Sequence, residues 1–232
     1  MKPVRNDTLY LEIKTILEEA RQSAYRAVNF AMVQAYWEIG RRIVEQEQAG
    51  NVKAAYGKGL LKELSQKLTA DFGKGFTETN LKYFRQFYIT FPPAEKSHAV
   101  RDQLNKKEVP QKSHALRSEL SWTHYRLLMR VENVAARNYY MQEAIAQNWS
   151  TRALERQINS FYYERIVSSK NKKAVAAEAK ANTENLAATP EDFIKDPYVL
   201  EFLDLPSDTG YLEKDLENAL IQKLQHFLLE LG

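Results

Sequence analysis

The chain has 232 residues, of which 44% are hydrophobic, so one or two domains with a substantial core are expected. It contains no cysteine and no apolar leader or bilayer-spanning run, which excludes disulfides and thiolate metal sites and favours a cytoplasmic protein that does not associate with membranes. The net charge of +3 is unevenly spread: residues 1–183 carry 30 basic and 19 acidic side chains (+11), and residues 184–232 carry 3 and 11 (−8).

The basic part of the chain is the first functional signal. Clustered Lys and Arg attract polyphosphates and gain affinity by releasing condensed counterions. The alternative is that the charge only keeps the protein dispersed. Charge by itself leaves both interpretations open.

The first predicted helix begins after a cap at Asp7 and continues to about Gln48, with a break near Ser23. Its first part has an apolar stripe formed by Leu9, Ile13, Ile16, Leu17 and Ala20. The aromatic run 36–40 could be a special motif, but aromatic residues at helical spacing are typical of a core. We expect core packing there.

Two further helices flank a glycine-containing turn at 73–76, over 59–72 and 77–90. This layout is typical of a helix-turn-helix, whose second helix enters the major groove. Its core face is predicted to consist of Leu81, Phe84, Phe87 and Tyr88. Its polar stripe consists of Glu78, Lys82, Arg85 and Gln86, from which Lys82, Arg85 and Gln86 could reach DNA. Any amphipathic hairpin with a solvated charged face gives the same pattern.

A polar surface loop or short wing is expected over 94–118, and capped helices follow it. Ser121, Asn133 and Ser150 are predicted N-caps, and apolar staples flank the two serines. Residues 168–188 resemble an exposed helix or a linker. A short helix starting at Asp196–Pro197 and an amphipathic helix that follows Ser207–Gly210 and ends at Gly232 complete the expected elements.

A second basic stripe follows Ser150. Arg152, Arg156, Asn159 and Tyr163 recur at steps of four, three and four, which predicts one helix face suited to a phosphate backbone. The opposite, buried face is predicted to comprise Leu154, Ile158, Phe161 and Tyr162. Both arginines could instead pair with Glu155 or with the acidic C-terminal segment.

Catalytic motifs are not found in the sequence. The four histidines lack ligand spacing, and no phosphate loop, H-E-x-x-H or G-x-S-x-G run is present. No catalytic site can be assembled from these residues.

Several segments together carry a resemblance to the YhcG family of bacterial proteins, which are assigned to the PD-(D/E)xK class of nucleases. They are AYGKGLLKELS (55–65), FGKGF (72–76), NLKYFRQFY (80–88), LSWTHY (120–125) and WSTRALERQI (149–158). The resemblance covers nearly the whole chain.

The resemblance implies an all-α N-terminal domain over 1–170 that binds DNA through a helix-turn-helix or winged-helix-like fold. It implies a helical linker over 171–189 and the start of a restriction-endonuclease-like α/β domain over 190–232. Glu217 would be the helix-borne acid of a Mg²⁺ site in a full-length relative. The Asp and Glu-x-Lys of that class have no counterpart here, so this chain is expected to be a truncated form that is inactive by itself and binds no cofactor.

Two functions therefore remain in competition. The first is a DNA-binding module of a nuclease, with contacts from Lys82, Arg85, Gln86, Arg152, Arg156 and Asn159. The second is a helical module that binds a partner, or a copy of itself, through aromatic surfaces around Trp122, Tyr139–Tyr140 and Phe161–Tyr163.

Overall fold

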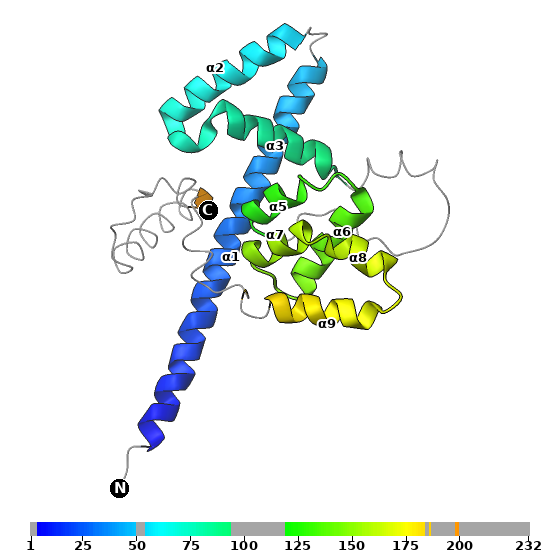
Figure 1. Cartoon of the computed structure of the whole chain (residues 1–232). Coiled ribbons are helices and arrows are strands. Elements are labelled where there is room, and N and C mark those ends of the chain that lie inside the picture. Colours follow the sequence, from blue (N-terminus) through cyan, green and yellow to red (C-terminus); the bar gives the residue numbers. More distant parts are fainter. Residues whose placement is uncertain (1–3, 50–53, 94–118, 184–185, 187–197, 200–232) are drawn as a thin grey trace.

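A computed structural model describes residues 4–49, 54–93, 119–183, 186, 198 and 199. Every regular element in these ranges is a helix, as Figure 1 shows. The elements are α1 (Val4–Ala49), α2 (Ala54–Phe72), the 3₁₀ turn η1 (Lys74–Phe76), α3 (Glu78–Thr90), α5 (Trp122–Leu128), α6 (Val134–Ala146), α7 (Thr151–Asn159), α8 (Tyr162–Ser168) and α9 (Lys172–Thr183). The predicted all-α class is confirmed for the described residues.

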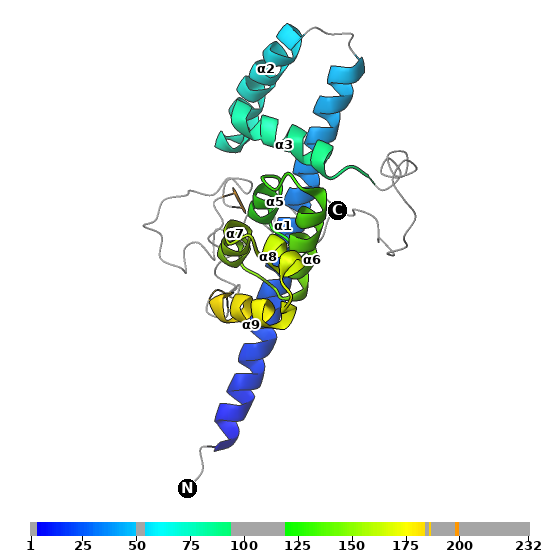
Figure 2. The ribbon, with the colours of Figure 1, turned by 45° about the vertical axis from the view of Figure 1, so that its right-hand side comes forward.

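The longest element is α1, a single helix with 46 residues. The predicted cap at Asp7 and the predicted break near Ser23 are both wrong, because the helix is already formed at Val4 and runs unbroken to Ala49. A lone serine among Ala, Arg and Gln residues lowers helix propensity only slightly, and adding residues to an existing helix is easy. Figures 1 and 2 show that its N-terminal part extends past the other helices.

The second half of α1 packs along α3 and forms the centre of the core. Tyr36 stacks on Phe84 with ring centroids 4.1 Å apart and meets Trp122 edge-on at 5.1 Å. The indole of Trp37 donates a hydrogen bond to the Phe91 carbonyl at 2.8 Å. The core assignment of the 36–40 run is therefore confirmed.

The arrangement of α2, η1 and α3 matches the predicted two helices around a glycine turn. Gly73 adopts a left-handed backbone with φ of 86°, which a residue without a side chain tolerates best. Thr77 caps α3 by accepting a hydrogen bond from the Asn80 amide. As predicted, α3 buries Leu81, Phe84, Phe87 and Tyr88. The loop or wing expected at 94–118 lies outside the described residues.

All three predicted caps downstream are confirmed. Ser121 caps α5, Asn133 caps α6 and Ser150 caps α7 through their side-chain oxygens. At α5 the Ser121 amide also donates to Nδ1 of His124, which closes a capping box. These caps fix where each of the short helices begins.

The segment 168–188, which is predicted to be an exposed helix or a linker, contains α9. This helix packs on α7 and α8. Most of its side chains are exposed, but Ala179 and Thr183 are buried. In Figures 1 and 2, α9 lies beside the compact group formed by α5 to α8. The helix thus belongs to the packed body.

Candidate nucleic-acid interface

The candidate site is built on α7, a short helix held in place by its buried face. Ser150 caps its start by accepting a hydrogen bond from the Ala153 amide at 3.2 Å. Ala153, Leu154 and Gln157 are buried on the side that faces the body. Arg152, Arg156 and Asn159 are therefore directed to the opposite, exposed side, as predicted.

These three exposed residues line one open depression of about 560 Å³. Its remaining lining residues are Glu155 and Ser160. Two guanidinium groups, one carboxylate, an amide and a hydroxyl thus meet on a single surface. Such a set offers mainly hydrogen-bond donors and a net positive charge, which suits an anionic ligand with several oxygen atoms.

Glu155 does not neutralise the two arginines through any described contact. Its Oε1 lies 3.7 Å from Nη1 of Arg130, in the turn that follows α5. Arg152 takes part in no ion pair among the described residues. The alternative in which Glu155 neutralises Arg152 and Arg156 by ion pairing is therefore not supported. The other predicted partner, the acidic segment, lies outside the described part of the chain after residue 199.

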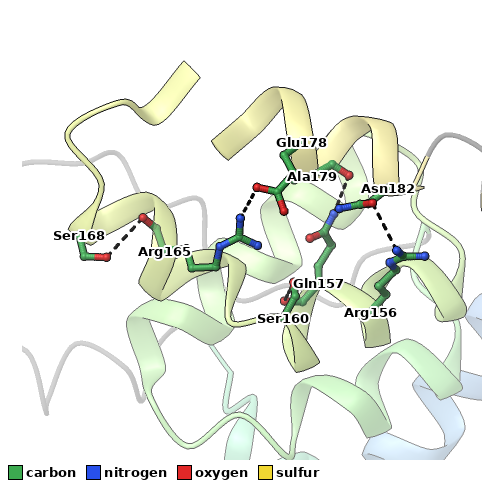
Figure 3. Close-up of polar contacts among 8 residues, drawn as sticks. All are labelled: Arg156, Gln157, Ser160, Arg165, Ser168, Glu178, Ala179 and Asn182. Atoms are coloured by element: carbon green, nitrogen blue, oxygen red, sulfur yellow. Dashed lines mark hydrogen bonds and ion pairs between the residues drawn. The ribbon is translucent and has the colours of Figure 1, made fainter. Parts of the chain in front are cut away.

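Helix α9 supports this surface from the side, as Figure 3 shows. Arg156 Nη2 donates to Asn182 Oδ1 at 3.3 Å, and the buried Gln157 Nε2 donates to the Ala179 carbonyl at 3.1 Å. Arg165 in α8 pairs with Glu178. One helix therefore orients Arg156 while leaving its other N–H groups able to donate.

Sequence reasoning missed this support from α9. The signal that could have found it is a short stripe of small or β-branched residues at helical spacing. Val175, Ala179 and Thr183 recur every four residues and face the body. Because the stripe lacks large side chains, its composition favoured an exposed linker.

The predicted stripe is wrong beyond Asn159. The helix ends there, and Phe161 adopts a left-handed backbone with φ of 52°, so α8 starts in a new direction. Phe161 was expected in the core but is 65% exposed. Tyr163 instead packs against Tyr139, with ring centroids 5.4 Å apart, and is not part of the α7 face.

The other predicted contacts lie on α3. Lys82, Arg85 and Gln86 are exposed, as expected for the polar face of that helix. Arg85 Nε donates to Glu47 Oε2 in α1 at 2.6 Å, so this guanidinium already has a partner. The pairing links residues 38 positions apart, and helical spacing could not reveal it.

The faces of α3 and α7 are separate surfaces on the same body. Helix α5 packs on both α3 and α7. The depression is lined only by residues of α7 and its C-terminal cap. The structure brings Arg152, Arg156 and Asn159 together but does not bring Lys82, Arg85 and Gln86 into the same depression.

The aromatic surfaces expected for the competing function are mostly interior. Trp122, Tyr140 and Tyr162 are buried. Burial, together with the neighbouring Glu164 carboxylate, raises the pKa of Tyr140 to about 12, so its hydroxyl stays protonated and donates to Glu164. Partner binding through these rings is not favoured, because they already pack within the protein.

No metal centre can be assigned from the described stretches, because they contain no group of three or more His, Cys, Asp or Glu side chains placed to hold an ion. Glu217, the predicted helix-borne acid, lies outside them. No helix in the same stretches is both long and apolar enough to cross a membrane.

The fold and the site define a class: a helical protein with a basic helix face exposed on a packed body. Residues 12–165 match the family described as the DUF1016 N-terminal domain, and residues 191–232 match the YhcG PDDEXK nuclease domain. The chain therefore belongs to the DUF1016 N-terminal domain family, and the resemblance to the YhcG family seen in the sequence is confirmed.

A curated relative from Escherichia coli (strain K12) is named "Putative nuclease YhcG". The alignment of the two sequences extends over 231 residues with 39% identity. It covers 94% of this chain and 60% of the relative. The chain thus spans about 60% of the relative's length. No solved structure matches the chain.

Proposed function

We propose that this chain binds DNA through the exposed face of α7 and acts as the DNA-binding part of a nuclease of the PD-(D/E)xK class. The observation that carries the proposal is the depression in which Arg152, Arg156 and Asn159 meet. Its opening to solvent and its donor-rich lining suit a phosphate backbone running over the surface.

Each side chain has a distinct role in this proposal. Arg152 and Arg156 hold consecutive phosphates, because a guanidinium presents its N–H groups in a fork that fits two phosphate oxygens. Asn159 supplies an uncharged donor at the end of the helix. Asn182 keeps Arg156 in position from α9, so less side-chain entropy is lost when the phosphate binds.

The polar face of α3 provides a second set of contacts. Lys82 and Gln86 lie one turn apart and are exposed, so both can reach the same ligand. Arg85 contributes through the guanidinium nitrogens that Glu47 does not engage. The helix-turn-helix interpretation of α2 to α3 belongs to this proposal, because the layout alone also occurs in helical proteins that bind no DNA.

The nuclease part of the proposal rests on family membership. The match over 191–232 is to a nuclease domain, and the E. coli relative has the word nuclease in its name. We propose Mg²⁺ as the cofactor of the full-length nuclease and Glu217 as one of its ligands. The described residues hold no comparable acidic cluster, so no hydrolytic step is assigned to them.

The proposal is tested by the salt dependence of DNA binding. Fluorescence anisotropy with a labelled duplex should show an affinity that falls steeply as salt rises. The double variant Arg152→Ala/Arg156→Ala should bind more weakly at low salt, and the slope of log K against log salt should decrease by roughly 1.8, the value expected for two lost phosphate contacts.

A matched control separates specific contacts from overall charge. Arg42→Ala/Lys67→Ala also removes two positive charges, but from exposed positions on α1 and α2. This control should leave the slope nearly unchanged. Undetectable binding by the unmodified chain at low salt, or equal slopes for both double variants, would contradict the proposal.

A further inference from the structure

The N-terminal half of α1 exposes an unusual amount of apolar surface. Every side chain described between Thr8 and Ala27 is exposed. The large apolar ones on this stretch are between 48% and 65% exposed and comprise Leu9, Tyr10, Leu11, Ile13, Ile16 and Leu17. Both Figure 1 and Figure 2 show this part of α1 extending away from the packed helices. Contiguous apolar surface of this kind marks an interaction site.

The apolar residues are arranged in the repeat of a helix that pairs with another helix. Successive steps of four and three residues connect Leu9, Ile13, Ile16, Ala20, Ser23 and Ala27. Tyr10, Leu17 and Ala24 recur every seven residues beside this line. Steps of three and four keep the same seam facing a second helix. Leu11, in contrast, lies about 160° around the helix from Ile13 and faces the other way.

We propose that the stretch from Leu9 to Ala27, the α1 arm, pairs antiparallel with the same arm of a second copy of this chain. The inference is independent of the proposed DNA binding. The arm is self-complementary because its first half carries bulky side chains and its second half carries small ones. In an antiparallel pair whose centre lies at residue 18, Leu9 of one copy packs against Ala27 of the other, and Ile16 packs against Ala20. The side-chain volume is therefore even along the seam.

Charge toward the two ends of the arm agrees with this register. Glu12 lies six residues before the centre and Arg26 eight residues after it, on the same flank of the seam, so Glu12 of one copy is level with Arg26 of the other to within about 3 Å along the axis. Lys14 and Glu18 pair within their own helix at 3.7 Å, on the outer side of the arm. A parallel pair would set bulky residues against bulky ones and alanine against alanine, leaving gaps in the second half.

The length of the arm is sufficient for such pairing. Eighteen helical steps extend about 27 Å, or five turns. An isolated helix of this length is marginal in water, whereas a helix that continues from a packed element and buries one face against a partner is stable. The second copy therefore accounts both for the helix and for its exposed apolar side.

Sedimentation of the whole chain tests the assembly. The unmodified protein should behave as a dimer, and Leu17→Glu should raise the dimer dissociation constant by roughly tenfold or more, because it places a charge in an apolar seam. Leu11→Glu is the matched control: Leu11 is 57% exposed against 54% for Leu17 but lies about 120° further around the same helix, away from the seam. It should leave the dimer intact.

Engineered disulfides test the direction of pairing, because the chain contains no cysteine of its own. Leu17→Cys lies near the centre of the antiparallel pair and should form a covalent homodimer under mild oxidation. Leu9→Cys should not form one alone, but it should cross-link with Ala27→Cys when the two variants are mixed.

Three results would overturn the inference. A chain that is monomeric at all accessible concentrations would do so, as would a dimer equally sensitive to Leu11→Glu and Leu17→Glu. Efficient homodimer formation by Leu9→Cys would indicate parallel pairing and would also contradict it. If the unmodified chain is monomeric and only Leu17→Glu lowers its unfolding midpoint, another segment of the same chain covers the arm.

Discussion

Gly40 is the residue on which the contact between α1 and α3 depends. A Cβ atom at this position would lie 2.0 Å from the Phe84 carbonyl oxygen and 3.2 Å from the Tyr88 Cβ. The obstructing atoms are mainly backbone, so a rotamer change cannot relieve the contact.

We predict that Gly40→Ala destabilises the protein by about 1–3 kcal/mol, since overpacking outweighs the better helix propensity of alanine. The free energy of unfolding in urea measures the effect. Gly59→Ala is the control, because a Cβ there meets nothing within 4 Å and alanine favours helix α2 by up to about 1 kcal/mol. Equal changes in both variants would show that helix propensity alone decides the outcome.

His124 is a buried residue that couples two helix starts. Its Nε2 donates to the Trp149 carbonyl at 2.9 Å, while Nδ1 accepts from the Ser121 amide at 3.2 Å. Because a carbonyl can only accept, the neutral ring with its proton on Nε2 satisfies both bonds. Burial lowers the pKa of His124 below its usual value, and the Trp149 carbonyl opposes that shift only in part.

The lowered pKa of His124 predicts a loss of stability in mild acid. The unfolded chain takes up the proton near pH 6.5 and the folded chain only at a lower pH. The stabilising contribution is therefore complete above about pH 6.5 and is lost as the pH falls toward the folded pKa, by at most about 1.4 kcal/mol per pH unit. Urea unfolding at pH 7.5 and 5.5 measures it.

The matched comparison is His124→Gln, which keeps a polar side chain but cannot titrate. This variant should be less stable at pH 7.5 and should lose less stability on acidification than the unmodified chain. The two proteins differ only at position 124, so contributions from the rest of the chain cancel in the difference. An identical pH dependence for the two proteins would contradict the assignment.

At the residue scale, local chemistry made the caps predictable. Ser121, Asn133 and Ser150 each accept hydrogen bonds from amides two or three positions ahead, so a short sequence window contains all of the information. The Arg85 pair with Glu47 and the close approach at Gly40 depend on the packing of α1 against α3. No local sequence pattern indicates that packing.

At the element scale, the end of α7 decides which residues form the candidate site. The spacing from Arg152 to Tyr163 predicted one continuous helix, but Phe161 interrupts it with a left-handed backbone. Left-handed phenylalanine is costly and rarely expected. Periodicity therefore predicted Arg152, Arg156 and Asn159 correctly as a shared face and failed for the two aromatic residues after them.

Helix α9 should dock through its small buried residues. We predict that Ala179→Glu releases α9, because the new carboxylate would lie in a buried position beside the Gln157 side chain. Trypsin should then cleave at the lysines of α9 roughly tenfold faster or more. Loss of the Asn182 contact should also weaken DNA binding through Arg156.

Ala177→Glu is the control for that experiment, because Ala177 lies on the same helix and is exposed. It adds the same charge without disturbing the docked face. Similar cleavage rates for the two variants would mean that α9 is not held by its contact with α7 and α8. In that case Asn182 would not position Arg156.

At the scale of the whole molecule, α1 organises the protein. Its second half forms the core with α3, and its first half is the arm that we propose for self-association. Composition was enough to predict an all-helical body, because Gly, Pro and strand-like alternation are scarce. The continuity of α1 and the placement of α5 between the α3 and α7 faces come from long-range packing, which composition does not encode.

The uneven charge along the chain has a structural counterpart in the described residues. The basic body carries the depression on α7, and Glu155 within it is paired with Arg130, in the turn after α5. Arg152 and Arg156, which carry the proposed function, form no ion pair with a described residue. Net charge could not have identified them.

Proximity of DNA to Asn159 tests the central claim most directly. Because the chain has no cysteine, Asn159→Cys can carry a single photoactivatable cross-linker, and Thr69→Cys on the exposed side of α2 serves as the control. Illumination with a bound duplex should cross-link DNA efficiently from position 159, weakly from position 69, and less from position 159 when Arg152 and Arg156 are alanine. Equal cross-linking from both positions, or DNA binding without cross-linking from position 159, would contradict the proposed interface.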